Sequence, residues 1–255
     1  MYEIYGITDI GYVRENNEDG FLIQNIYCNN GQYYLKEVHE PWIAAVADGM
    51  GGEQAGEIAS KIALEELAKL KLPTTDEDLQ EHLFRINQKI IEYGEQNLES
   101  KGLGTTLTGL ICIDDELTLF HIGDSRAYRF RDGFLKLLSQ DHSLVESLYQ
   151  SGKISREDKV IHPQRHILLR CLGGTDTTKI SNSNVDVKKI RGKFEAGDVF
   201  LLCSDGLTDL VQDEEIESIL IESLTLEQKA RKLIDKANQI GGNDNITLIA
   251  VKRCT

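Results

Sequence analysis

The sequence predicts an α+β protein in which strands and helices form separate blocks. Strand patterns come first, two helical patterns follow, and a second set of strands comes next, with one more helix before the last strand. A parallel β/α/β sheet would instead alternate strand and helix along the chain. The 255 residues are 40% hydrophobic, which suffices for one large core, so we expect a single domain over residues 1–255.

The first block consists of strand patterns. Residues 2–8 alternate between apolar and polar side chains, which is the period of a half-buried strand. Residues 21–27 and 42–47 read as further strands. Residues 28–40 lie between them and contain Asn30-Gly31, which predicts a turn within an extended hairpin.

Two amphipathic helix patterns follow. The first begins after Gly52 and places four apolar residues on one face: Ile58, Ile62, Leu67 and Leu70. The second covers about residues 76–98 and has apolar residues at i, i+4, i+7, i+11 and i+14: Leu79, Leu83, Ile86, Ile90 and Tyr93.

The second block is again dominated by strands. Four of them read as a meander, at residues 105–113, 116–122, 127–131 and 134–138. Asp132-Gly133 predicts a hairpin turn between the last two. Residues 144–178 are richer in charge and lack clear alternation. Beyond them, strands are expected at 185–190, 199–203 and 246–252, with a helix at 226–240.

Charge and composition exclude several classes of function. The formal net charge of −14 argues against nucleic acid or an anionic membrane as the main partner, because their phosphates would be repelled. No apolar run approaches the roughly 20 residues of a membrane helix, and the N-terminus lacks a signal-peptide pattern. The five cysteines show no CxxC spacing and read as reduced thiols of a cytoplasmic protein.

Four acidic motifs are the most informative part of the sequence. Their carboxylates lie beside glycine or asparagine, so each is expected in a tight turn at a strand end. Carboxylates that converge on one centre repel each other, and a bound divalent cation relieves that repulsion. Oxygen ligands with water favour Mg²⁺ or Mn²⁺ over zinc. The motifs are Thr8 to Asp19, Asp48-Gly49-Met50-Gly51-Gly52, Ser204-Asp205-Gly206 and Gly241-Gly242-Asn243-Asp244-Asn245.

The order of these motifs resembles the bacterial-type, metal-dependent serine/threonine phosphatases of the protein phosphatase 2C family. The similarity covers about residues 5–250 and implies an αββα sandwich of two antiparallel sheets flanked by helices, with metals at one end of the β core. It also implies that residues 144–178 form a small flap subdomain. Four further motifs carry it: Gly104-Thr105-Thr106, Gly123-Asp124-Ser125-Arg126, Asp141-His142-Ser143 and His162-Pro163-Gln164-Arg165.

The resemblance implies a centre of two metal ions that share one carboxylate and activate a water for attack on phosphorus. Asp48 is the expected shared ligand, with the Gly49 carbonyl as a further one. Asp205 and Asp244 would complete the shell of the first ion. Glu18 would face the second ion, directly or through water, with Asp19 alongside, although an Asp-Gly turn is the alternative reading of Asp19.

Arg14 is the expected phosphate-binding residue and, with Asp48, Asp205 and Asp244, is assigned to catalysis. A guanidinium donates two parallel hydrogen bonds to phosphate oxygens, and Arg14 stands four residues before Glu18 in the family motif.

Two further residues have weaker assignments. Asp124 matches the position at which related bacterial enzymes hold a third metal together with Asp205. Its alternative is a turn between the strands at 116–122 and 127–131. Asn245 is expected only to brace a turn.

The group that protonates the leaving alkoxide is left open. Many eukaryotic relatives carry a histidine after the Asp-Gly pair, where this chain has Met50, and Glu53 stands where some bacterial relatives have one. Of the six histidines, His142 lies in the Asp141-His142-Ser143 motif, and the others are read as surface or core residues. Water held by the metals is the expected donor.

The resemblance therefore implies Mn²⁺- or Mg²⁺-dependent hydrolysis of phosphoserine and phosphothreonine on proteins, opposing a bacterial serine/threonine kinase. Two alternatives remain. One is a phosphatase-like module that binds a partner without turnover, although degenerate copies usually lose a core aspartate and none is missing here. The other is a hydrolase of small phosphate esters.

Overall fold

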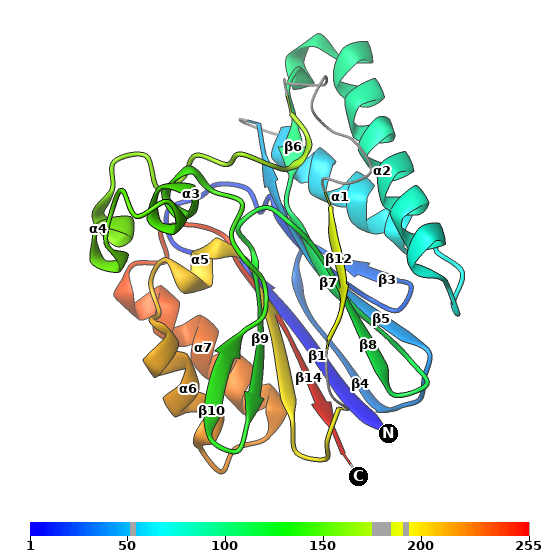
Figure 1. Ribbon diagram of the computed structural model, residues 1–255, viewed down its shortest axis with the longest axis vertical. Coiled ribbons are helices and arrows are strands. Elements are labelled where there is room, and N and C mark those ends of the chain that lie inside the picture. Colours follow the sequence, from blue (N-terminus) through cyan, green and yellow to red (C-terminus); the bar gives the residue numbers. More distant parts are fainter. Residues whose placement is uncertain (52–54, 175–184, 191–193, 255) are drawn as a thin grey trace.

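Two antiparallel sheets pack face to face in the computed structural model, and helices cover both outer faces (Figure 1). The structure describes residues 1–51, 55–174, 185–190 and 194–254. Its layers confirm the α+β class that the sequence pattern predicts and the αββα sandwich that the family resemblance implies.

The six-stranded sheet carries helices α6 (Asp213–Ile221) and α7 (Leu226–Ile240) on its outer face. Apolar side chains of both helices, such as Ile216 and Leu233, pack against Leu201 and Leu248 of the sheet. Its strands in spatial order are β10 (Phe134–Leu137), β9 (Arg126–Arg131), β13 (Val199–Cys203), β14 (Ile246–Arg253), β1 (Tyr2–Asp9) and β4 (Gly31–Val38).

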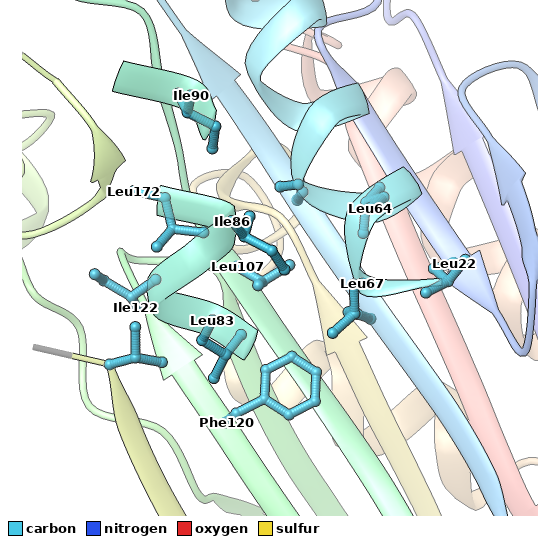
Figure 2. Close-up of a cluster of buried hydrophobic side chains, with 14 of the residues drawn as sticks. Leu22, Leu64, Leu67, Leu83, Ile86, Ile90, Leu107, Phe120, Ile122 and Leu172 are labelled. Carbon is cyan, nitrogen blue, oxygen red and sulfur yellow. The ribbon is translucent and has the colours of Figure 1, made fainter. Parts of the chain in front are cut away.

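The eight-stranded sheet carries α1 (Ala55–Leu67) and α2 (Asp76–Gln96), which is followed by the short 3₁₀ helix η1 (Leu98–Ser100). Figure 2 shows Leu64 and Leu67 of α1 and Leu83 and Ile86 of α2 packed over the sheet. Its main path runs through β11 (Leu172–Gly173), β6 (Gly104–Thr105), β5 (Trp42–Met50), β7 (Leu107–Ile113), β8 (Glu116–Ile122) and β12 (Asp186–Lys189). Two more strands extend from β5, namely β2 (Asp19–Ile23) and β3 (Ile26–Cys28).

A third apolar layer fills the space between the sheets and includes Phe21, Val46 and Phe200. Side chains alternate along each strand, so residues two apart share a face. On β5, for example, Ala45 belongs to the layer under the helices, whereas Val46 belongs to the layer between the sheets.

Two predicted hairpin connections instead cross between the sheets. The turn at Asn30-Gly31 joins β3, which pairs with β2, to β4, which pairs with β1 in the other sheet. The predicted meander likewise divides after Ile122, because β7 and β8 pair in one sheet while β9 and β10 pair in the other. A turn signal shows where the chain reverses and carries no information about which strand it then joins.

Helix α1 turns a different face to the core than the sequence predicts. Its buried apolar residues are Ala55, Ala59, Ala63, Leu64 and Leu67, whereas Ile58 and Ile62 are only partly buried and Leu70 lies beyond the helix. A Cβ at Gly49 would lie 2.0 Å from the Gly56 carbonyl oxygen, so α1 begins in direct backbone contact with β5. Small side chains on this face permit that close approach.

The segment predicted as a flap contains α3 (Leu144–Gln150) and α4 (Arg156–Ile161), which lie outside the two-sheet layers near α5 (Asp205–Thr208) (Figure 1). The described part of the segment ends with β11, which pairs with β6 of the main sheet. Residues 175–178 of the predicted flap lie outside the described residues. The flap assignment therefore stays a prediction.

Candidate active site

Strand periodicity carries Asp19 and Asp48 to the inner face of the eight-stranded sheet, at one end of the sandwich. Asp19 lies two residues before Phe21 on β2, and Asp48 lies two residues after Val46 on β5. The register of the two strands places Asp19 directly opposite Asp48. Like charges opposed across a sheet are destabilising, so this pair indicates a site for a cation.

Asp205 and Asp244 lie just beyond the ends of two neighbouring strands of the six-stranded sheet. Asp205 follows the buried Ser204 after β13, and Asp244 comes two residues before β14, which pairs with β13. The Ser204 hydroxyl donates to Oδ2 of Asp19 at 2.6 Å and so joins the two sheets at the site. Carboxylates from both sheets therefore meet across the end of the inner layer.

Burial and crowding raise the pKa of these carboxyl groups. The pKa of Asp48 lies well above its usual value, first because the group is desolvated and then because Asp19, Asp205 and Asp124 are near. Burial, with Asp209 as the next cause, raises the pKa of Asp205 to about 7. Carboxylates in this condition lack compensating positive charge, which a divalent cation would supply.

Glu18 is fixed through its backbone beside the paired aspartates. Its N–H donates to Oδ1 of Asn245 at 2.8 Å, and its carbonyl accepts from the Ser60 hydroxyl at 2.6 Å and the Gly49 N–H at 3.2 Å. A Cβ at Gly56 would lie 2.7 Å from Cδ of Glu18, so the start of α1 abuts this carboxyl group. The predicted ligands Glu18 and Gly49 are thus neighbours.

Asn245 braces the loop that carries Arg14 and Glu18, as the sequence predicts. Its Nδ2 donates to the carbonyls of Ile10 and Asn16, both at 3.0 Å, while its Oδ1 accepts from Glu18. The side chain is 3% exposed. One buried amide therefore ties both ends of this loop to the residue that precedes β14.

Arg14 lies at the exposed rim of the site. Its Nη2 donates to Oδ2 of Asp244 at 2.7 Å, and its side chain is 50% exposed. The ion pair orients the guanidinium at the acidic centre while part of it faces solvent.

Asp124 lies in the connection that crosses from β8 to β9. The Thr106 and Ser125 hydroxyls hydrogen-bond at 2.7 Å beside this crossing. Burial, with Asp205 as the next cause, raises the pKa of Asp124 well above its usual value. Asp124 therefore lies in a turn and near Asp205, and its expected role as a ligand of a third metal stays a prediction.

The sequence does not single out His166 and Asp209, which lie close to the predicted ligand Asp205. Within the described residues, the one set of three or more possible ligands whose donor atoms all lie within 4.8 Å of each other is His166, Asp205 and Asp209. Glu53, the residue at the position of some relatives' histidine, lies outside the described residues.

The donor set fits Mg²⁺ or Mn²⁺. The predicted ligands offer oxygen only. Burial is the first cause of the raised pKa values of Asp19, Asp48 and Asp205, and a bound cation would supply the positive charge that favours their ionised forms. The oxygen atoms of the predicted ligands lie farther apart than the ligand atoms of the set around His166. Wide spacing suits Mg²⁺ and Mn²⁺, because each ion keeps several waters and binds few carboxylates.

Comparison with known proteins decides the family. Residues 24–239 match the sequence profile of the family described as Protein phosphatase 2C. The chain belongs to this family. A serine/threonine phosphatase, stp, of Listeria monocytogenes serotype 4b is 38% identical over 254 residues, which cover 96% of this chain and 94% of the relative. Protein phosphatase PhpP of Streptococcus pneumoniae strain D39 is 36% identical over 256 residues, covering 98% and 96%.

Solved structures place the chain in the same family. The serine/threonine phosphatase PstP/Ppp of Mycobacterium tuberculosis superimposes with a TM-score of 0.84 at 33% identity, covering all of both chains. A structure of the PstP catalytic domain in complex with two manganese ions gives a TM-score of 0.81 at 31% identity, again covering both chains fully. Protein phosphatase 2C enzymes are metal-dependent, which agrees with the donor set of this chain.

Proposed function

We propose that this protein hydrolyses phosphoserine and phosphothreonine esters on other proteins, using two Mn²⁺ or Mg²⁺ ions in the centre around Asp48. The observation that carries this proposal is the meeting of carboxylates from both sheets, with Asp19 directly opposite Asp48. Membership of the protein phosphatase 2C family and the phosphatase names of its relatives support it.

We assign Asp48 to both ions, with the Gly49 carbonyl beside it. Asp205 and Asp244 would hold the first ion, and Glu18 the second. Asp19 would support the second ion from its buried position beside Asp48. When bound, the ions supply a water activated for attack and neutralise charge on the phosphate.

The protein's own groups hold these ligands in place. The Thr105 hydroxyl donates to the Asp48 carbonyl, and the Asp48 N–H donates to the Thr106 hydroxyl, both at 2.9 Å. The half-exposed Arg14 guanidinium would bind the substrate phosphate and orient it. Met50 stands at the position where many relatives carry a histidine, and in our proposal the leaving group would receive its proton from water held by the ions.

The partners would be phosphorylated proteins, including a serine/threonine kinase and its substrates, in the cytoplasm. The net charge of −14 argues against nucleic acid as the main partner, because its phosphates would be repelled. Among the described residues, no helix has both the length and the apolar character needed to cross a membrane.

The test compares substrates and metal conditions. Purified protein should dephosphorylate a phosphothreonine peptide in Mn²⁺ or Mg²⁺ and lose that activity in EDTA. Asp48→Ala, Asp205→Ala and Asp244→Ala should each lower kcat by several orders of magnitude, because each removes a metal ligand. Near-normal turnover in any of the three would overturn the role given to that residue.

Two outcomes would favour the alternative functions. Failure to hydrolyse p-nitrophenyl phosphate with Mn²⁺ would indicate a binding module without turnover. Faster turnover of small phosphometabolites than of the phosphopeptide would indicate a small-molecule phosphatase.

A further inference from the structure

Exposed apolar side chains directly precede Arg14 in the loop that carries it. Tyr12 is 73% exposed and Val13 is 64% exposed, and Ile10 of the same loop is also exposed. A single apolar residue on a protein surface needs no explanation. Three of them within the four positions 10–13, beside a proposed binding residue, indicate a surface that contacts a ligand.

The backbone of this loop is fixed against the loop that carries Asp244. The Tyr12 N–H donates to the Gly242 carbonyl at 2.8 Å. A Cβ at Gly11 would lie 2.4 Å from the Asp244 carbonyl oxygen, so the two backbones are in direct contact. The ion pair between Arg14 and Asp244 joins the same two loops through their side chains. A loop held in this way loses little conformational entropy when a ligand binds.

The Tyr12 ring lies over a glycine and faces solvent with most of its surface. A Cβ at Gly242 would lie 3.3 Å from Cδ2 of Tyr12, so this ring edge contacts the opposite loop. Tyrosine supplies a large and rigid contact area at a low cost in conformational entropy, and it is enriched in binding interfaces. The ring is therefore suited to packing against an apolar group.

Chain geometry places these side chains beside the neighbours of a bound phosphoresidue. Tyr12 and Arg14 are two residues apart, so their Cα atoms are separated by about 7 Å at most. An extended substrate peptide held by its phosphate at Arg14 advances about 3.3 Å per residue. Its residues one or two positions from the phosphorylated one can therefore contact Tyr12 and Val13.

Nearby charges disfavour one class of substrate. Glu15 is exposed next to Arg14, and the Asp244 carboxylate is 38% exposed. An acidic residue beside the phosphorylated one would be repelled by these groups, whereas an apolar residue would not.

We propose that Tyr12 and Val13 form a docking surface for a large apolar side chain of the substrate, one or two positions from the phosphorylated residue. The inference rests on the proposed phosphatase function and gives it a sequence preference. Phosphopeptides with apolar flanks are preferred, and those with acidic flanks are disfavoured.

The test measures the binding of two peptides to the full chain in Mn²⁺ by fluorescence anisotropy. Both contain a non-hydrolysable phosphonate in place of phosphothreonine, and they differ only in having leucine or serine at the two positions on each side of it. The leucine peptide should bind at least ~10-fold more tightly, which is the discrimination expected when an apolar group enters an apolar site.

The double variant Tyr12→Ser with Val13→Ser should remove this preference, because both apolar contacts are lost. A matched control is Phe134→Ser on β10, which changes an aromatic residue that is also 73% exposed and should keep the preference. Failure of the leucine peptide to bind, equal affinity for the two peptides, or an unchanged preference in the double variant would overturn the proposal.

Two further results separate this proposal from its rivals. Dimerisation that the double variant abolishes, together with equal affinity for the two peptides, would assign the surface to a second copy of the chain and overturn the proposal. The phosphonates report binding without turnover. A chain that prefers the leucine peptide but hydrolyses no phosphopeptide would therefore support the docking surface and refute the proposed hydrolysis alone.

Discussion

Arg14 is joined to the acidic centre by a single ion pair with Asp244. Arg14→Ala should mainly raise KM, with a smaller loss of kcat, because the guanidinium binds phosphate in the ground state and in the transition state. The cost should be about 1.5–3 kcal/mol, typical of a charged hydrogen bond. Arg14→Lys should restore only part of it, since an ammonium cannot make the parallel pair of bonds. Steady-state measurements of KM and kcat on a phosphopeptide test this prediction. Wild-type values in both variants would show that Arg14 is only a solvated loop residue.

His121 makes stability depend on pH. The ring is 2% exposed and hydrogen-bonds the Thr108 hydroxyl and the Gln140 carbonyl, both at 2.9 Å. Burial, with nearby His142 as the second cause, lowers its pKa to about 4. A lowered folded-state pKa means that the unfolded chain binds the proton first, so stability is full above about pH 6.5 and falls toward pH 4.

The expected loss is on the order of 3 kcal/mol for a shift of this size. Urea unfolding at several pH values should show a smaller decrease in His121→Gln than in wild type. His39→Gln, at an exposed position, serves as the control. An unchanged pH slope in His121→Gln would contradict the assignment.

At the same scale, the sequence predicts motif residues well and spatial neighbours poorly. Asp48 and Asp205 carry a local signature, namely a carboxylate beside glycine at a strand end. His166 carries none, because it approaches Asp209 only after the segment following α4 folds back near α5. On a helix, the four-residue spacing of Asp205 and Asp209 would predict that their side chains share one face. The helix α5 spans only four residues, however, which is too few for the sequence to predict a helix there.

At the level of elements, the contact between β5 and α1 is the most restrictive. Gly49→Ala would place a Cβ 2.0 Å from the Gly56 carbonyl oxygen and 2.8 Å from the Glu18 carbonyl oxygen. Overpacking of this kind costs about 1–3 kcal/mol or more, and here it should also weaken metal binding by displacing Glu18. Chemical unfolding and Mn²⁺ titration measure the two effects. Gly133→Asn, in open space at a hairpin turn, should change neither, and an unaffected Gly49→Ala protein would disprove this packing constraint.

Elements with one strong periodic signal are predicted with their observed bounds, as β8, β13 and α7 are. The face that α1 buries could not be predicted from hydrophobic periodicity. The residues on that face are mostly alanine and glycine, whose small size lets the helix approach β5 closely. The crossings between sheets also escape prediction, since strand pairing depends on residues far away in sequence.

For the whole molecule, metal binding and folding should be linked. Ions that bind only the folded state stabilise it by about 2.7 kcal/mol per site at 100 times Kd. Thermal unfolding should therefore shift upward and saturate with Mn²⁺, and EDTA should reverse the shift. Asp48→Asn should lose most of this response while leaving the metal-free protein at least as stable at pH 8, because one of two opposed charges is gone. A full Mn²⁺ shift in Asp48→Asn would show that the stabilising ion binds elsewhere.

The ligands of the proposed centre come from two sheets whose separation is set by the apolar layer between them, where Val46 and Phe200 lie. Because the carboxylates are attached to both sheets, the side-chain volume in that layer sets how far apart the ligands of the proposed ions lie. Natural selection on turnover would then also act on residues that never touch substrate. Substitutions that change the side-chain volume of this layer would alter metal affinity before they cause a large loss of stability.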